Sequence, residues 1–176
     1  MTPNDLRQIP LTALFAAAAV ILPQFFHLVG LGPTFLPMFL PVMLGCFFLT
    51  WKFAFVLAIL PPIVSFAITG MPPLIPPILP IMILELITIT MVISILYMHM
   101  HKNIWIALII AIISDRLLLF LIVSWIAPMF GFTHPMFTLA MVATGIPGII
   151  MQIIVIPLAL KLIYQKYPQF KPDFDE

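Results

Sequence analysis

Long apolar runs, separated by short segments rich in proline, glycine or charge, dominate the chain. A helix that crosses a bilayer needs about 20 mainly apolar residues, because it rises about 1.5 Å per residue. The pattern therefore predicts an all-α bundle of six transmembrane helices that forms a single domain over residues 1–176. The predicted spans are residues 9–28, 35–50, 53–69, 80–98, 104–127 and 139–163, followed by a short polar tail at 168–176.

Prolines modify this pattern. The chain has 19 of them, about twice the usual frequency. Pro37 and Pro41 are expected to interrupt the second run, and Pro61 and Pro62 the third. The proline-rich segment 69–77 is not expected to be helical, because each proline removes a backbone donor and restricts the residue before it. We predict that this segment is an ordered, apolar loop.

Composition excludes several classes of protein. Hydrophobic residues make up 64% of the chain and charged residues only 7%, whereas a soluble domain has roughly 45–50% and about 25%. An ordinary soluble domain is therefore excluded, as is a disordered chain, which would be poor in apolar residues. The net charge of +1 and the lack of a basic patch argue against a nucleic-acid partner. Cys46 has no second cysteine to pair with and is interpreted as a packing residue.

The basic residues indicate how the chain is oriented. In a six-span topology all of them except Arg116 fall on one side of the membrane, and the three connections on the other side have none. They are Arg7, Lys52, Lys102, Lys161, Lys166 and Lys171. Cytoplasmic segments of membrane proteins are enriched in Lys and Arg, so both termini are predicted to be cytoplasmic.

Three ionisable residues, Glu85, Asp115 and Arg116, fall inside predicted spans. Each such charge costs at least roughly 2.5–3.5 kcal/mol to insert, so they should face the bundle interior and find partners. One hypothesis is a structural ion pair between Glu85 and Arg116, and another is a polar anchor for a ligand; the two are compatible. Asp115 and Arg116 point about 100° apart on a helix, so they need not serve the same site.

Further candidate ligand contacts lie in the last span and the outer connections. Gln152 and Thr144 could bind a ligand or only link helices through hydrogen bonds. The outer loops are apolar, which predicts either a lid or packing against lipid headgroups. In the lid hypothesis Met71, Pro72 and Leu74 form the gate. His27 lies at the outer end of the first run, as an interfacial residue or a further ligand contact.

Small residues in the first run, Ala13 and Ala17, lie four apart and would permit close approach of another helix. This helix could be internal or part of another membrane subunit. The sequence contains no HExxH, GxSxG or P-loop motif. We therefore expect no catalysis, no metal site and no cofactor, and the chain has no motif for driving transport with ATP by itself.

Several segments, taken in order, resemble the substrate-binding S components of energy-coupling factor (ECF) vitamin transporters. They are the alanine-rich first run, Leu31-Gly32-Pro33, Leu36-Pro37-Met38, Thr69 to Leu74, Met82 to Leu86, the Arg of the fifth span, Gly145 to Ile149 with Gln152, and Ile156-Pro157. The resemblance covers about residues 10–165.

This resemblance implies a subunit that binds a vitamin or related micronutrient at the outer side of a prokaryotic plasma membrane. Its implied partners are a transmembrane coupling subunit, which would dock on Ala13 and Ala17, and two cytoplasmic ATPase subunits, which use the ATP. The chain departs from the family at Asp115, where Gly is expected, and at Ile87 to Thr90. Two other hypotheses stay open, a structural or assembly subunit and an intramembrane enzyme using Glu85 or Asp115 as acid or base.

Overall fold

The described part of the chain is helical throughout. A computed structural model describes residues 3–28, 30–129, 143 and 145–170, without the side chains of residues 3–5, 27 and 33. The elements are α1 (Pro3–Leu28), α2 (Gly32–Phe35), α3 (Phe39–Cys46), α4 (Trp51–Thr69), α5 (Ile78–Ile93), η1 (Ser94–His99), α6 (Ile104–Leu121), η2 (Ile122–Ile126), α7 (Ala127–Met129), α9 (Ile146–Lys166) and η3 (Pro168–Phe170). No strand occurs in these residues, and the predicted all-α membrane fold is confirmed.

Within the described ranges, five helices are long and apolar enough to cross a bilayer. They are Leu6–Phe26, Trp51–Thr69, Ile78–His99, Ile104–Met129 and Ile146–Lys166. The last one starts later than the predicted span 139–163, whose first residues fall mostly outside the described part of the chain. These helices define a multi-pass membrane protein.

The predicted second span, 35–50, is not a continuous helix. It consists of α2, a turn and the eight-residue α3. Leu36 ends α2 in the left-handed conformation, with φ 47°, and Pro37 follows, which disfavours a helical conformation at the residue before it. Pro41 is tolerated because it lies in the first turn of α3, where a backbone N–H has no helical partner anyway.

This broken segment nevertheless runs alongside α1. At one end the rings of Phe26 and Phe35 lie 5.6 Å apart, and at the other the Thr50 N–H donates to Gln8 Oε1 (2.8 Å). The stretch of α1 between Gln8 and Phe26 is about 27 Å long at roughly 1.5 Å per residue, close to the thickness of a bilayer core of about 30 Å. The broken segment therefore lies antiparallel to α1 over this length, and a sixth membrane crossing there stays a prediction.

The core of the bundle forms around α3. This helix contacts α1, α4, α5 and α9, and its buried residues are Phe39, Pro41, Val42, Met43, Gly45 and Cys46. A helix buried on most of its surface must be apolar on every side, which explains its unbroken hydrophobic sequence. The prediction that Cys46 is a packing residue agrees with its complete burial.

The expectation that Pro61 and Pro62 interrupt the third run is wrong. Helix α4 continues through both residues from Trp51 to Thr69, and both are buried. Membrane helices tolerate such prolines because neighbouring groups in the bundle satisfy the freed backbone carbonyls. The helix ends instead at Gly70, whose φ of 73° is the left-handed conformation common after the last helical residue.

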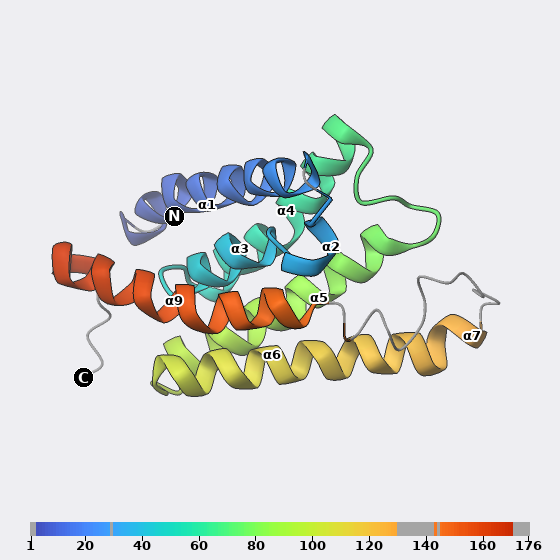
Figure 1. Ribbon diagram of the computed structural model, residues 1–176. Helices are drawn as coiled ribbons and strands as arrows, with labels where there is room; N and C mark the ends of the chain where they lie inside the picture. Colours follow the sequence, from blue (N-terminus) through green and yellow to red (C-terminus); the bar gives the residue numbers. More distant parts are fainter. Residues whose placement is uncertain (1–2, 29, 130–142, 144, 171–176) are drawn as a thin grey trace.

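The bundle has two chemically different ends (Figure 1). The basic end holds the start of α1, the α3–α4 and η1–α6 connections and the end of α9, and with them Arg7, Lys52, Lys102, Lys161 and Lys166. The proline-rich end holds the end of α1, α2, the loop 70–77 between α4 and α5, and the start of α9. Apart from Arg116, the basic residues that the structure describes therefore gather at one end, as the topology predicted.

Candidate functional site

Two buried carboxylates face each other between α5 and α6. Glu85 belongs to the buried stripe of α5, and Asp115 to the buried stripe of α6 with Leu108, Ala111 and Leu119. Their exposed fractions are 6% and 2%. These helices pack extensively against each other, so their inward faces bring the two acids together.

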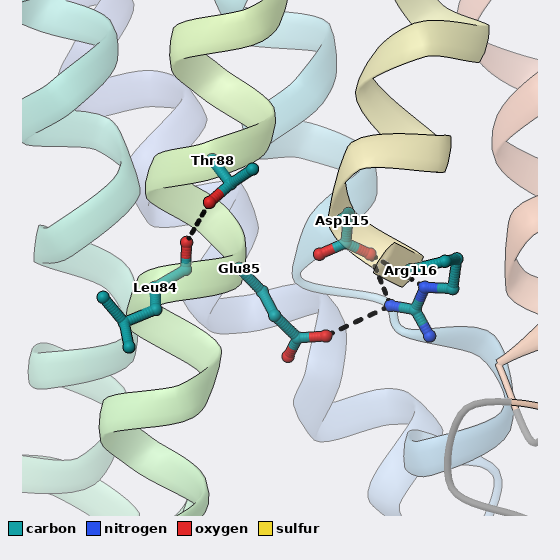
Figure 2. A network of polar contacts seen from close by, with 5 residues as sticks. All are labelled: Leu84, Glu85, Thr88, Asp115 and Arg116. Atoms are coloured by element: carbon teal, nitrogen blue, oxygen red, sulfur yellow. Dashed lines mark hydrogen bonds and ion pairs between the residues drawn. The ribbon is translucent and has the colours of Figure 1, made fainter. Parts of the chain in front are cut away.

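Arg116 joins the two carboxylates into one network (Figure 2). Its Nη2 lies 3.2 Å from Glu85 Oε1 and 2.5 Å from Asp115 Oδ2, and its Nε donates to the same Asp115 oxygen at 2.9 Å. Hydrogen bonds between charged groups are roughly twice as strong as neutral ones. The sequence-based hypothesis of a Glu85–Arg116 ion pair agrees with this geometry.

The expectation that Asp115 and Arg116 diverge needs correction. Their Cα–Cβ bonds do point in different directions around the helix, but the arginine side chain is long enough to fold back onto its neighbour. Asp115 and Arg116 therefore belong to one network rather than two sites. Thr88, one turn from Glu85, donates to the Leu84 carbonyl of its own helix (2.9 Å) and does not join it (Figure 2).

Some buried polar atoms have no partner. Among the described residues these are Asp115 Oδ1, Gln152 Nε2 and Ser94 Oγ. Leaving such an atom unpaired costs about 1–3 kcal/mol, and most buried polar groups in proteins are paired. Asp115 Oδ1 can accept a hydrogen bond and Gln152 Nε2 can donate one. No group of three or more His, Cys, Asp or Glu gathers within the described ranges as metal ligands would.

Gln152 is the polar member of the inward face of α9. That face carries Gly148, Gln152, Ile156 and Leu160 at helical spacing. Burying such a residue in the core costs free energy unless its amide forms hydrogen bonds. Since the Nε2 of Gln152 has none here, its position in the bundle suits a role other than packing.

Two glycines at the start of α9 allow close packing around the network. A Cβ at Gly145 would lie 3.2 Å from Arg116 Nη1 and 2.8 Å from Leu36 Cδ1, and a Cβ at Gly148 would lie 2.5 Å from the Phe35 carbonyl oxygen. Helix α2 can therefore approach α9 this closely only because Gly148 lacks a side chain, whereas the atoms next to Gly145 are the ends of flexible side chains. Sequence reasoning did not assign these roles, although small residues at helical spacing are a signal of close helix contact.

The other predicted contacts lie in different places. Met71 and Leu74 are exposed and Pro72 is half-buried, all in the loop 70–77 at the proline-rich end. The loop is anchored by the Met71 N–H, which donates to Thr69 Oγ1 (3.2 Å), and by the Leu79 N–H, which donates to the Pro73 carbonyl (3.0 Å). Thr144 and the side chain of His27 lie outside the part of the chain that the structure describes.

The small residues of α1 divide into two faces. Ala16 and Ala19 are buried in the bundle, whereas Ala13 and Ala17 are exposed on its outside. The internal-packing hypothesis for Ala13 and Ala17 is therefore wrong. Their face is open to another helix or to lipid.

A groove of about 870 Å³ lies elsewhere, at the basic end of α6 and α9. Its lining residues are Asn103, Ile104, Trp105, Ile153, Ile154, Pro157, Leu158, Lys161, Tyr164 and Gln165. Trp105, Ile154 and Leu158 are all more than half exposed, so the groove opens on the outer surface of the bundle. It contains none of the predicted ligand contacts, and we do not regard it as the ligand site.

The fold and the network define a multi-pass membrane protein with a charged interior. Residues 7–164 match the family described as ECF transporter, substrate-specific component. The match covers most of the chain, so the protein belongs to this family, as the sequence resemblance predicted. A comparison with curated proteins and one with solved structures each gave no match.

Proposed function

We propose that this chain is the subunit that captures a vitamin or related micronutrient for an ECF transporter. The family is one of substrate-specific components, which agrees with the sequence-based expectation that the chain is not an enzyme. In the proposal the proline-rich end faces the outside of a prokaryotic plasma membrane, and both termini are cytoplasmic. The gathering of Lys and Arg at the opposite end supports this orientation.

The observation that carries the proposal is the pair of unpartnered atoms, Asp115 Oδ1 and Gln152 Nε2. A purely structural network gains nothing by burying atoms that it leaves unpaired. Small-molecule sites, by contrast, consist of mostly apolar surroundings with a few placed polar groups. We assign Glu85 and Arg116 to holding the geometry of Asp115, and Asp115 and Gln152 to contacting the ligand. Thr144 and His27 remain candidate contacts.

The loop and the exposed alanines complete the proposal. Met71, Pro72 and Leu74 lie at the end from which a ligand would enter, and their apolar side chains suit a gate. Ala13 and Ala17 would dock the transmembrane coupling subunit, because their exposed face allows a second helix to approach closely. Two ATPase subunits would use the ATP, since the chain itself has no P-loop motif.

A second function, that of a structural subunit, is favoured by one observation. Arg116 already has both Glu85 and Asp115 as partners, so the network is partly self-sufficient without a ligand. If the charges served only to pair helices, joint replacement of Glu85, Asp115 and Arg116 by apolar residues of similar volume would be tolerated.

Native mass spectrometry of the purified protein, titrated with a panel of water-soluble vitamins, separates the two functions. The proposal predicts a one-to-one adduct with one compound, and a loss of affinity of at least about tenfold in Gln152→Leu, which removes one hydrogen bond. Ala17→Leu is the control, because its side chain lies outside the bundle and should affect docking but not capture. No adduct with any compound, or unchanged affinity in folded Gln152→Leu, would contradict the proposal.

A further inference from the structure

The charges of the network set the class of ligand that it can accept. We infer that the part of the ligand that meets Asp115 is cationic or a neutral hydrogen-bond donor, and not an anion. This inference rests on the proposed function and deepens it. It depends on three features of the described residues: the net charge of the network, the occupied donors of Arg116, and the unpartnered oxygen of Asp115.

The network contains more acid than base. It joins two carboxyl groups, Glu85 and Asp115, to one guanidinium group. Its net charge is therefore −1 when both carboxyls are ionised, and zero when they share a proton. In neither state does it offer a positive charge to balance an anion. Because charges interact strongly in a low-dielectric interior, an anionic ligand group would be repelled or left unbalanced.

Of the three guanidinium nitrogens of Arg116, two already donate to carboxylates, which leaves an anion only Nη1. Arginine recognises carboxylates and phosphates best through two parallel N–H groups. One such edge, formed by Nε and Nη2, is taken by Asp115 Oδ2, and Nη2 also donates to Glu85. The remaining nitrogen, Nη1, lies close to Gly145 at the start of α9. A two-pronged contact with an anionic ligand through Nε and Nη2 would have to displace Asp115.

Such a displacement would be costly. Asp115 is 2% exposed, and a buried charge that loses its partner is strongly destabilising. The opposite arrangement needs no rearrangement at all. Asp115 Oδ1 is already an unpaired acceptor, so a ligand N–H or O–H could bind it while Oδ2 stays on Arg116. A cationic donor would also balance the net negative charge.

Asp115 is the residue of the network that accounts for this preference. A glycine there would leave the arginine with Glu85 alone and its Nε free for an anion. The aspartate therefore acts as a selectivity residue: it removes the anion site and supplies an acceptor in its place.

The test is a binding panel sorted by charge, measured by native mass spectrometry and by isothermal titration on the full chain. Thiamine is the cationic probe, riboflavin and pyridoxine are neutral, and biotin, pantothenate and folate are anionic. The inference predicts that the ligands that bind are cationic or neutral. It also predicts that Asp115→Asn weakens the cation about 10- to 100-fold, the loss of one charged hydrogen bond. Tyr97→Phe at the basic end is the control and should leave all affinities unchanged.

The outcomes distinguish the inference from the proposed function. Tight binding of an anion by the unmodified protein would overturn the inference and leave capture intact. Binding of no probe would overturn capture, and the inference with it. Because the charge ranking is read on the unmodified chain, the inference can be decided even if Asp115→Asn does not fold. Where that variant folds, unchanged cation affinity would also overturn the inference.

Discussion

The two ends of the bundle satisfy their polar groups in different ways. At the basic end the contacts between elements are neutral and paired. Gln8 Oε1 accepts hydrogen bonds from the Thr50 N–H and Oγ1 at 2.8 and 2.9 Å, and the hydroxyls of Tyr97 and Tyr164 lie 3.1 Å apart. Toward the proline-rich end the contacts are charged, and Asp115 and Gln152 have buried atoms left over.

This difference separates polar groups that stabilise the fold from polar groups that we assign to binding a ligand. A neutral paired hydrogen bond ties α1 to the start of α4, or η1 to α9, and leaves nothing unsatisfied. The charged network costs more to bury and leaves the acceptor Asp115 Oδ1 unpaired, and Gln152 on α9 has an unpaired donor of its own. Ser94 Oγ is an unpaired atom nearer the basic end, but a hydroxyl carries no charge and can rotate toward any acceptor.

The largest expected effect follows from removing one charge of the network. Glu85→Ala should destabilise the protein by about 1.5–3 kcal/mol, because Arg116 loses one charged hydrogen bond while it keeps Asp115 as a partner. Thermal unfolding in detergent measures this. Glu85→Gln is the matched control, since it keeps the shape and a hydrogen-bond acceptor, and it should be clearly more stable than Glu85→Ala. Equal stability of Glu85→Ala and the unmodified protein would show that the network is not structural.

A smaller effect is expected from filling the contact between α2 and α9. Gly148→Ala places a methyl group against the Phe35 carbonyl and should cost about 1–3 kcal/mol, the range for overpacking. Ligand affinity should fall as well, because α2 and the start of α9 would move apart beside Arg116. Gly30→Ser separates overpacking from backbone strain: no neighbouring atom restricts its side chain, so any loss of stability there comes from its positive φ of 72°. An unchanged melting temperature in Gly148→Ala would contradict the packing described here.

At the basic end, Tyr97→Phe removes one neutral hydrogen bond. The expected cost is about 0.5–1.5 kcal/mol, and ligand affinity should not change. Measuring both quantities on the same preparation sharpens the comparison, because the basic end is predicted to affect stability alone. A fall in affinity as large as that of Gln152→Leu would remove the distinction between the two ends.

The smallest effect on stability is expected from Gln152→Leu. An apolar side chain of similar size replaces an amide that lacks a partner for its Nε2, so the free energy of unfolding should stay the same or rise. Chemical or thermal unfolding without ligand tests this. A clear loss of stability would show that Gln152 has a structural role in the unliganded protein.

Much of the fold could be predicted from the sequence, because the length of each apolar run and the positions of the basic residues follow directly from the order of the residues. The inward faces could not, since a helix such as α5 is apolar all around and shows no polar stripe to mark its outside. Only a charged residue such as Glu85 or Asp115 reveals which side is buried, by the cost of exposing it to lipid.

The errors have similar physical causes. The break in the second span depends on the left-handed conformation of Leu36, a residue that rarely adopts it. The continuity of α4 depends on neighbours that accommodate Pro61 and Pro62. The Asp115–Arg116 contact depends on how a long side chain folds back, which the direction of Cβ does not determine. Each is a tertiary effect that the local sequence does not specify.

The most direct test of the central claim is an experimental structure of the protein with its captured ligand. In that structure the ligand should accept a hydrogen bond from Gln152 Nε2 and donate one to Asp115 Oδ1, while Arg116 stays on Glu85 and Asp115. A ligand bound in the groove between α6 and α9 at the basic end, with those two atoms still unpaired, would contradict it.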